Sequence, residues 1–392
     1  MLPKRHLSSQ RRHARGASMI EIMVGVLIGL VAVLVIYQIF TVAEGLKRNT
    51  TGAADAQQNG LLSTFTLALE LNSAGNGISD AAGRLIRCTP VAGAPDEAIK
   101  VTRKPIPALI EPGASDDVPD ALVVIYGTAS STTDAAEIAS VGTLAAGSAS
   151  LPVRSPNGFH QGDQIVLIQD AGVAPPATSP CASDVVGAPP HVVTAAVPPP
   201  NASGIVTLTI SPATPFDVTN NSMVVNLGPS TQTQRVRYSV ANETLRSLDL
   251  VNPAAVAVPL ASNVVNMKAQ YGIDNNNDGI IDTWVKADAV PFTPTDLLNA
   301  NFSLDNDCNV NPISCIRAFR IGLVVRSDQW DRDLKTPAGD FAWTLFDCED
   351  PVKANCPGRM TGTIVQSATG GWRYRVFETV VPLRNQVWMY AP

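Results

Sequence analysis

The stretch RRHARGASMIEIMVGVLIGLVAVLVIYQIF, residues 11–40, decides how this chain is built. Positions 1–16 hold five basic residues and no acidic one. An apolar run follows from Ile22 to Phe40, with only Gln38 interrupting it. This run is long enough for a helix that crosses a membrane. Because positive charges stay on the cytoplasmic side, the rest of the chain is expected to be exported.

Glu21 lies at the start of this apolar run and requires an explanation. An ionisable side chain within a membrane helix costs roughly 2.5–3.5 kcal/mol on insertion scales and is usually functional. A cleaved secretory signal would have a shorter apolar core, followed by a small-residue cleavage site. A plain signal anchor fits the length and orientation but leaves Glu21 unexplained. The simplest alternative is a carboxylate that reaches water at the membrane surface.

The residues around Gly16 resemble the leader of type IV prepilins, a short basic segment that ends in Gly. In that family a prepilin peptidase cuts before the apolar helix, which is retained, and the new amino terminus is methylated. The resemblance implies cleavage between Gly16 and Ala17, N-methylation of Ala17, and a mature chain with Glu21 as its fifth residue. Many members begin with Phe, and Ala17 departs from that pattern.

The resemblance also implies a role for Glu21 as an assembly contact. Pilin helices pack in a dry bundle, where an unpaired carboxylate and an unpaired ammonium group would each be costly. Glu21 of one subunit would neutralise the amino-terminal charge of its neighbour and set the axial register.

A second helical stretch follows, with no proline from Thr41 to Gly77. The spacing i, i+4, i+8 predicts an amphipathic helix that continues onto a globular head. The apolar stripe consists of Leu61, Leu62, Phe65 and Leu69. Glycine lowers helix propensity by about 1 kcal/mol relative to alanine, so bends or local melting are expected at three positions. These are Gly45, Gly52 and Gly60. A helix from Ala17 to about Asn72 would be on the order of 80 Å long.

From Cys88 onward the sequence predicts strands separated by Pro, Gly and Asn turns, with no long helix. The clearest runs begin at residues 120, 162, 204, 222, 233, 264, 316 and 372. In one of them Phe319, Ile321, Leu323 and Val325 fall on one face. The region from about 125 to 235 is rich in Ala, Ser, Pro, Thr and Gly and is interpreted as a loop-heavy β insertion.

Two C-terminal stretches, Ile316–Trp330 and Arg373–Trp388, resemble the end of the PilW-type minor pilins. The last strand of that family closes with a pattern whose counterparts here are Arg375, Phe377, Thr379, Leu383, Arg384 and Asn385. The stretch Gln57–Gly75 resembles the end of that family's first helix, which is followed by a cysteine, here Cys88.

The chain has six cysteines, an even number that fits an oxidising compartment. Two close pairs, Cys308 with Cys315 and Cys348 with Cys356, bracket short loops, which favours local bridges. Cys88 and Cys181 complete a working prediction of three disulfides. Six cysteines allow 15 pairings, between which the sequence alone does not choose.

The stretch DNNNDGIIDTW, residues 274–284, has the spacing of an EF-hand-like calcium loop. Its ligands would be Asp274, Asn276, Asp278, the carbonyl of Ile280, and Asp282. The twelfth position, normally a bidentate glutamate, is Val285. No cofactor is required, and if this loop binds Ca²⁺ the affinity is expected to be weak. The alternative is a β-turn rich in Asn and Asp.

Charge and motif content exclude other classes of function. The chain carries −6, and setting aside the five positive charges of residues 1–16 leaves −11 for the remainder. Nucleic-acid binding is not expected, because phosphate neutralisation needs clustered basic residues. There is no nucleophile elbow, phosphate-binding loop or dinucleotide fingerprint, so no enzymatic activity is expected. His160 and His191 are expected at the surface or in loops.

Together these features predict an α+β, pilin-like fold with a long N-terminal helix packed on an antiparallel sheet and a large β-rich insertion. The expected segments are a leader (1–16), a membrane or filament-core helix (17–40), an amphipathic helix (41–75) and a periplasmic head (76–392).

The expected function is that of a minor pilin which primes type IV pilus assembly, and with it twitching motility or adhesion. It would lie in the inner membrane and later in the fibre or at its tip. Its partners would be other minor pilins, the major pilin and the prepilin peptidase. Three alternatives remain: a type II secretion pseudopilin, a signal-anchored periplasmic binding module, and a periplasmic enzyme.

Overall fold

The structure is a computed structural model of the 392-residue chain. It describes residues 18–76, 88–89, 106–127, 136–139, 142–154, 158–168, 179–180, 191–214, 216–229, 235–250, 254–276, 278–299, 308, 312–330, 340–348, 356, 358–365 and 371–384. The chain divides into two compact units, Met1–Ala53 and Ala54–Pro392, which are considered separately.

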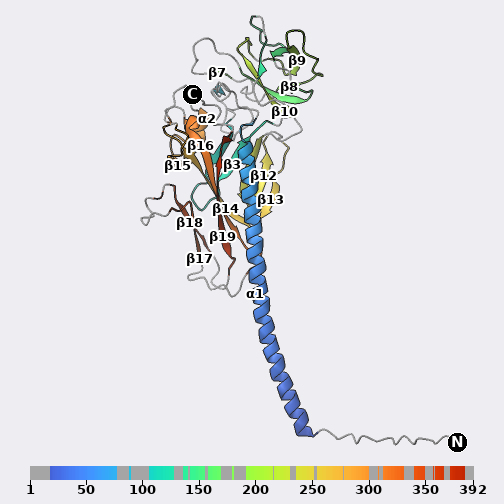
Figure 1. The fold of residues 1–392 in the computed structure, drawn as a ribbon, viewed down its shortest axis with the longest axis vertical. Coiled ribbons are helices and arrows are strands. Elements are labelled where there is room, and N and C mark those ends of the chain that lie inside the picture. Colours follow the sequence, from blue (N-terminus) through green and yellow to red (C-terminus); the bar gives the residue numbers. More distant parts are fainter. Residues whose placement is uncertain are drawn as a thin grey trace, which may run out of the picture. The chain divides into compact units, whose positions relative to one another are not determined.

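Helix α1 spans Met19–Ser73, so its part from Ala54 onward belongs to the second unit (Figure 1). The carbonyl of Ser18 accepts hydrogen bonds from the amides of Glu21 (2.9 Å) and Ile22 (3.1 Å) at the first turn. Gly75 adopts φ +77°, the left-handed conformation in which glycine ends many helices. The expected stop is confirmed.

Local melting at the three glycines of this helix is not observed, because the helix is continuous across all of them: Gly45, Gly52 and Gly60. Gly60 is buried against the ring of Phe377, so its packing offsets the lower helix propensity.

The second unit contains a four-stranded antiparallel sheet, ordered β15-β14-β16-β19. Its strands are β14 (Val264–Ile273), β15 (Thr283–Lys286), β16 (Ile316–Arg326) and β19 (Tyr374–Pro382). The predicted inward face of β16 is confirmed, since Phe319, Ile321, Leu323 and Val325 are all buried in the main core. Val324 is buried on the opposite face, so both faces of this strand are covered and burial continues along most of its length.

A five-stranded antiparallel sheet, ordered β13-β12-β11-β3-β2, adds the second layer of strands. Its members are β2 (Ala108–Glu111), β3 (Ala121–Ile125), β11 (Arg235–Ala241), β12 (Thr244–Asp249) and β13 (Val258–Ser262). Asn242 and Glu243 connect β11 to β12 with φ values of 50° and 54°, as a two-residue hairpin turn requires.

One hydrophobic core joins these two sheets to the last part of α1. Leu67 and Leu71 of the helix lie in the same cluster as Leu122 of β3 and Tyr271 of β14. Burying each such side chain contributes about 1.5–3 kcal/mol to the free energy of folding. The helix therefore belongs to the folded head from about Ala56 onward.

A hairpin of β17 (Asp340–Leu345) and β18 (Met360–Val365) covers the other face of β16. Trp343 and Leu345 pack there with Val324. An added Cβ atom at Gly322 of β16 would contact Leu345, so a glycine at this position allows the close approach of the hairpin.

Residues 136–229 contain a six-stranded sheet with its own core, ordered β4-β10-β6-β8-β9-β5. Its strands are β4 (Ala136–Glu137), β5 (Ser150–Arg154), β6 (Asp163–Ile168), β8 (His191–Val193), β9 (Ile205–Ser211) and β10 (Met223–Pro229). Burial alternates strictly along β9, the pattern of a strand with one covered face. The strands expected within the insertion are present.

The remaining elements are short. Strands β1 (Cys88–Thr89) and β7 (Ser179–Pro180) pair in parallel. Helices α2 (Pro294–Asn299) and α3 (Pro312–Cys315) are the two helices that follow α1 within the described ranges. All eight predicted strand runs coincide with strands, and the fold is α+β with one long N-terminal helix and several antiparallel sheets.

Candidate functional site

Glu21 lies in the first turn of α1, three residues after Ser18. Ser-x-x-Glu is the spacing of a capping box, and an acidic side chain in the first turn also interacts favourably with the helix dipole. This local role was not predicted. Glu21 is exposed, so it is accessible to a charge from another molecule. The predicted cleavage site, Gly16 and Ala17, lies outside the described residues.

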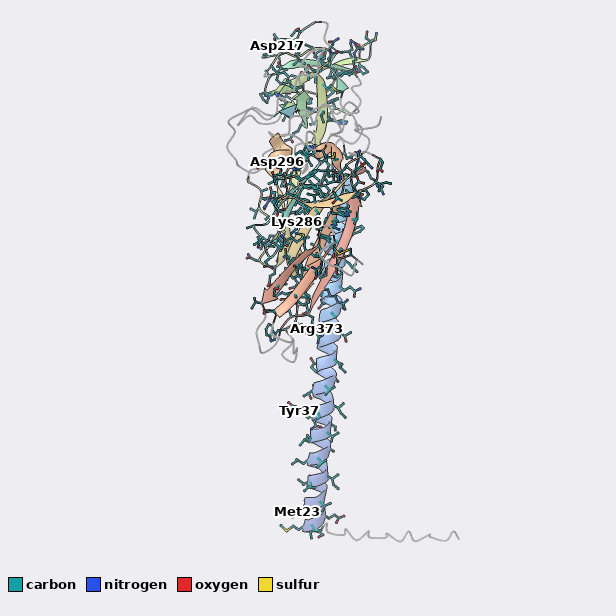
Figure 2. The ribbon with its side chains drawn as sticks, turned by 90° about the vertical axis from the view of Figure 1, so that its left-hand side faces the viewer. Met23, Tyr37, Asp217, Lys286, Asp296 and Arg373 are labelled. Carbon is teal, nitrogen blue, oxygen red and sulfur yellow. A yellow bond between two sulfur atoms is a disulfide. The ribbon has the colours of Figure 1, made fainter. Side chains whose placement is uncertain are left out.

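The first part of α1 exposes apolar side chains on all sides. Met23 and Tyr37 project from the helix with 67% and 68% of their surface exposed (Figure 2). By length and composition this helix is the one candidate for a membrane span among the described residues. It is therefore a candidate membrane anchor at the N-terminus.

The part of α1 that packs on the head does so through three small residues followed by two leucines. Its buried positions recur every three or four residues along one face: Ala56, Gly60, Ser63, Leu67 and Leu71. A Cβ atom at Gly60 would overlap the ring of Phe377 on β19. Phe377 belongs to the C-terminal pattern identified in the sequence, so this contact joins that pattern to the helix.

The apolar stripe expected to anchor this part of the helix lies on the opposite side. Leu61, Leu62, Phe65 and Leu69 are 55%, 51%, 66% and 55% exposed. Their spacing did predict the helix, but they do not face the core. At position 60 the reason is steric, because a side chain there would overlap the ring of Phe377. Further along the helix two leucines, Leu67 and Leu71, do face the core.

A polar cluster fixes the end of α1 to the five-stranded sheet. The hydroxyls of Tyr126 and Tyr238 donate hydrogen bonds to the carboxylate of Glu70. Burial, followed by the negative charge of Glu70, raises the pKa of Tyr126 to about 12 and raises that of Tyr238 as well. Next to this cluster the amide of Gly75 donates to the carbonyl of Ile125 at 2.8 Å.

The predicted calcium loop is a compact turn organised by Asp274. Asp274 is buried, and its carboxylate accepts hydrogen bonds from the amides of Asp278 (3.2 Å) and Gly279 (2.9 Å). The same carboxylate pairs with Nε of Arg317 at 3.1 Å. Asp282 accepts a hydrogen bond from the amide of Asn275 at 2.7 Å.

The predicted ligands are therefore close in space, and Arg317 supplies a positive charge to one of them. Asn276 contacts Asp278 through its side-chain amide, and Ile280 donates its amide to Asp278. Within the described residues no three His, Cys, Asp or Glu side chains are arranged to hold a metal ion. Calcium binding by this loop stays a prediction.

Two of the predicted disulfides are present, Cys308–Cys315 and Cys348–Cys356. The first lies beside the Asp274 turn, where the amide of Asp274 donates to the carbonyl of Cys315 at 2.9 Å. Cys181 and the side chain of Cys88 lie outside what the structure describes.

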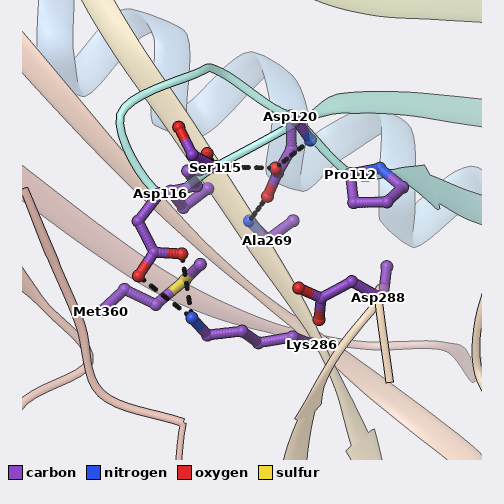
Figure 3. A pocket seen from close by; sticks show the side chains of 11 residues that line it. Pro112, Ser115, Asp116, Asp120, Ala269, Lys286, Asp288 and Met360 are labelled. Atoms are coloured by element: carbon purple, nitrogen blue, oxygen red, sulfur yellow. Dashed lines mark hydrogen bonds and ion pairs between the residues drawn. The ribbon is translucent and has the colours of Figure 1, made fainter. Parts of the chain in front are cut away.

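A small polar pocket lies between the 112–120 loop, β14 and β15 (Figure 3). The buried ammonium of Lys268 donates to two carbonyls of that loop and to Asp120 at 2.9 Å. Asp116 and Lys286 form an ion pair at its edge, also at 2.9 Å. A cavity of about 30 Å³ has room for one or two water molecules and is too small for an organic ligand. We interpret this cluster as the anchor of the loop.

The two histidines after the apolar helix differ in setting. His160 is exposed, as expected. His191 lies in β8 and is buried, so its expected position at the surface or in a loop is wrong. Its ring contacts the carbonyl of Pro212 at 2.7 Å. Burial lowers the pKa of His191.

Comparison with known proteins supports the resemblance in the C-terminal part of the chain. Residues 233–385, less than half of the chain, match the family model described as Type IV Pilus-assembly protein W, PilW. The matched region begins before β11 and includes β14, β16 and β19. This match supports a PilW-like identity and involvement in type IV pilus assembly.

The comparisons with curated proteins and solved structures identify no further relative. No curated protein matches the chain. Among solved structures, the phage phi92 endosialidase is similar at 10% identity and a TM-score of 0.13, over 69% of this chain and 49% of that one. The chain thus spans about half the length of that structure, and a TM-score this low carries no information on fold.

Proposed function

We propose that this protein is a minor pilin that primes assembly of a type IV pilus as part of a complex with other pilin-type subunits. The main structural observation behind this proposal is the contact between Gly60 of α1 and Phe377 of β19. Phe377 lies in the region that matches the PilW family, whereas Gly60 lies in the helix that begins with the prepilin-like motif. The contact therefore packs the helix that follows the prepilin-like N-terminus against the PilW-like region, which supports a single pilin-like fold.

In this proposal the prepilin peptidase cuts between Gly16 and Ala17, and Ala17 is methylated. The apolar part of α1 then holds the chain in the inner membrane, with its amino terminus cytoplasmic and its head periplasmic. During assembly this segment moves from lipid into a helix bundle. Both lipid and the helix bundle surround the segment with apolar groups, so this step removes little apolar surface from water. Close packing and charge pairing therefore supply the free energy of association.

Glu21 supplies the charge pairing in the assembled bundle. Its carboxylate pairs with the amino-terminal charge of a neighbouring subunit, which removes two unpaired charges from an apolar bundle. In the membrane-inserted subunit the capping-box position of Glu21 stabilises the start of the helix in the meantime. The broad acidic head would then lie at the growing end of the filament or at its tip.

The variant Glu21→Val tests this function in cells. We expect piliation and twitching to be lost or strongly reduced, while mass spectrometry of the membrane-extracted N-terminal peptide still shows a methylated Ala17. A matched control is Glu44→Val, which removes an acid from α1 outside the first turn. Normal pili in the Glu21→Val strain would refute the assembly role, and an intact leader in a strain with active peptidase would refute the pilin assignment.

A further inference from the structure

A cluster of aromatic and arginine side chains lies where β16 ends and β19 begins. The rings of Trp330 and Trp372 meet edge to face, with centroids 4.5 Å apart and planes at 82°. The guanidinium group of Arg326 lies over the ring of Trp372, 4.2 Å from its centroid. Next along the chain, the ring of Tyr374 stacks on that of Phe341 at 4.8 Å. We name the following residues the aromatic end: Arg326, Trp330, Trp372, Arg373 and Tyr374.

The aromatic end is only partly buried. Trp343 lies in a core and is 2% exposed, whereas Trp330 leaves 39% of its surface exposed. Trp372, Arg373 and Tyr374 are half-buried. Tryptophan and tyrosine combine an apolar ring with a polar group, and both are enriched where a protein meets the headgroups of a bilayer. The setting of these rings therefore matches a membrane–water interface better than a protein core.

Arginine gives this end a charge that is complementary to lipid phosphate. Arg375 is exposed and follows the cluster directly. Two acidic residues near it are engaged by the protein, since Glu243 pairs with Arg326 and Asp328 accepts a hydrogen bond from Asn263 at 3.5 Å. Guanidinium groups bind phosphate through paired hydrogen bonds. The acidic charge elsewhere on the head is screened beyond about 8 Å at physiological ionic strength, so the arginines decide the local attraction.

A carbohydrate fits these rings less well than a lipid headgroup. A sugar ring needs an open aromatic face to pack on, but one face of Trp372 is covered by Arg326. The edge-to-face geometry of Trp330 and Trp372 also prevents the pair from forming a flat platform. Headgroups require no platform, because amphipathic rings lie among them.

The aromatic end lies at the end of the second unit where α1 enters it. Phe377 of β19 contacts Gly60, and β19 runs alongside α1 (Figure 1). Arg373 precedes Phe377 by four residues, and Figure 2 shows it beside the helix, at the opposite end of the head from Asp296. Ala54, the first helical residue of this unit, likewise precedes Gly60.

The chain limits how far this end lies from the membrane anchor. Ala54 follows Phe40, the end of the apolar run, by fourteen positions of continuous helix. At 1.5 Å per residue this is about 20 Å in any orientation of the two units. From Phe377 back to Trp372 the chain extends up to about 16 Å towards the entry of α1. Because headgroups add about 5–8 Å to the hydrocarbon on each side, they are within reach of the aromatic end.

We propose that the aromatic end of the head binds the headgroup layer of the membrane that anchors α1. The rings of Trp330 and Trp372 lie among the headgroups, and the arginines bind lipid phosphates. This inference rests on the proposed function for the membrane-anchored state of the subunit. It goes further in assigning a second membrane contact to the head itself, which holds the head in one orientation before the subunit enters a filament.

Quenching of tryptophan emission by brominated lipid tests the contact. The full-length protein is reconstituted in vesicles of phosphatidylethanolamine and phosphatidylglycerol whose acyl chains carry bromine close to the headgroup. We expect quenching in the wild type and loss of most of it in the double variant Trp330→Phe, Trp372→Phe, which keeps aromatic rings at both positions. Trp284→Phe, on β15, is the matched control and should retain the quenching. An unchanged thermal unfolding midpoint shows that the double variant is folded.

The charge contribution is tested separately. Arg375→Gln should weaken the quenching, as should vesicles without phosphatidylglycerol, because anionic lipid attracts arginine. Arg384→Gln, an exposed arginine after the other end of β19, is the control and should have no effect. Equal quenching of the wild type and the double tryptophan variant would overturn the proposal. So would emission that responds to soluble peptidoglycan fragments but not to vesicles, since the site would then bind carbohydrate.

The outcome is distinguishable from that of the proposed function. If deleting the chain leaves pili normal, the proposed function fails, and quenching of the purified protein still decides the lipid contact. If deletion abolishes pili but brominated lipid does not quench Trp330 or Trp372, only the lipid contact fails.

Discussion

The ring of Phe377 lies directly against the backbone of Gly60, so that a side chain at position 60 would occupy the space of the ring. Glycine is unfavourable within a helix by about 1 kcal/mol relative to alanine. Its presence in the continuous helix α1 is explained by this contact, because it lets β19 and the helix pack without a gap.

Replacing Gly60 with leucine should destabilise the head. The added side chain overlaps the Phe377 ring, and overpacking of this kind typically costs about 1–3 kcal/mol. Denaturant unfolding of the full-length protein in detergent measures the change. Gly45→Leu is the matched control, since no atom lies within 4 Å of a Cβ placed there. Equal stability of the two variants would show that Phe377 does not constrain position 60.

The buried pair of Asp274 and Arg317 makes a second prediction. The carboxylate of Asp274 is fully buried, and Nε of Arg317 lies 3.1 Å from it. Asp274→Asn leaves the arginine charge buried without its counter-charge, a change that costs about 3–5 kcal/mol. The exposed residue Asp278 in the same turn provides the control, because Asp278→Asn should change the unfolding free energy by less than about 0.5 kcal/mol. A small effect at Asp274 would mean that its loop relaxes to admit water.

Calcium binding by the 274–282 loop gives a third prediction. We expect binding only at millimolar Ca²⁺, because Arg317 competes for Asp274 and the twelfth loop position is Val285. Isothermal titration of the full-length protein should show heat that is absent in Asp282→Ala. Removing the competing charge with Arg317→Gln should tighten binding. No heat in the wild-type protein at millimolar Ca²⁺ would leave the loop as a structural turn.

The long helix and the strands could be predicted because their signals are local. The apolar run from Ile22 and the alternation along β16 are properties of consecutive residues, and the structure agrees with both. The two short disulfide loops were predictable for the same reason, since their cysteines are seven and eight residues apart.

The packing face of α1 was not predicted from the large apolar residues, because it depends on a strand more than 300 residues later. The pattern of large apolar residues predicts a buried face with Leu61, Phe65 and Leu69. In the structure the buried face instead includes Gly60, which leaves room for the ring of Phe377. Spaced small residues within an otherwise apolar helix are the signal that would have indicated this face. The pairing of Asp274 with Arg317 is likewise non-local, and only the structure brings the two side chains together.

The ionisation of Tyr126 makes stability depend on pH in the alkaline range. Burial, and then the charge of Glu70, raises the pKa of Tyr126 from its ordinary value of 10.0 to about 12. Because the folded pKa lies above the unfolded one, the stabilisation is fully present below pH 10 and is lost as pH rises towards about 12. The free energy of unfolding of the wild type should therefore fall across this pH interval. In Tyr126→Phe it should fall less steeply. Tyr37→Phe, which removes an exposed hydroxyl far along the chain from the cluster, should leave the slope unchanged. Identical slopes for Tyr126→Phe and the wild type would show that the cluster with Glu70 does not hold the proton on Tyr126.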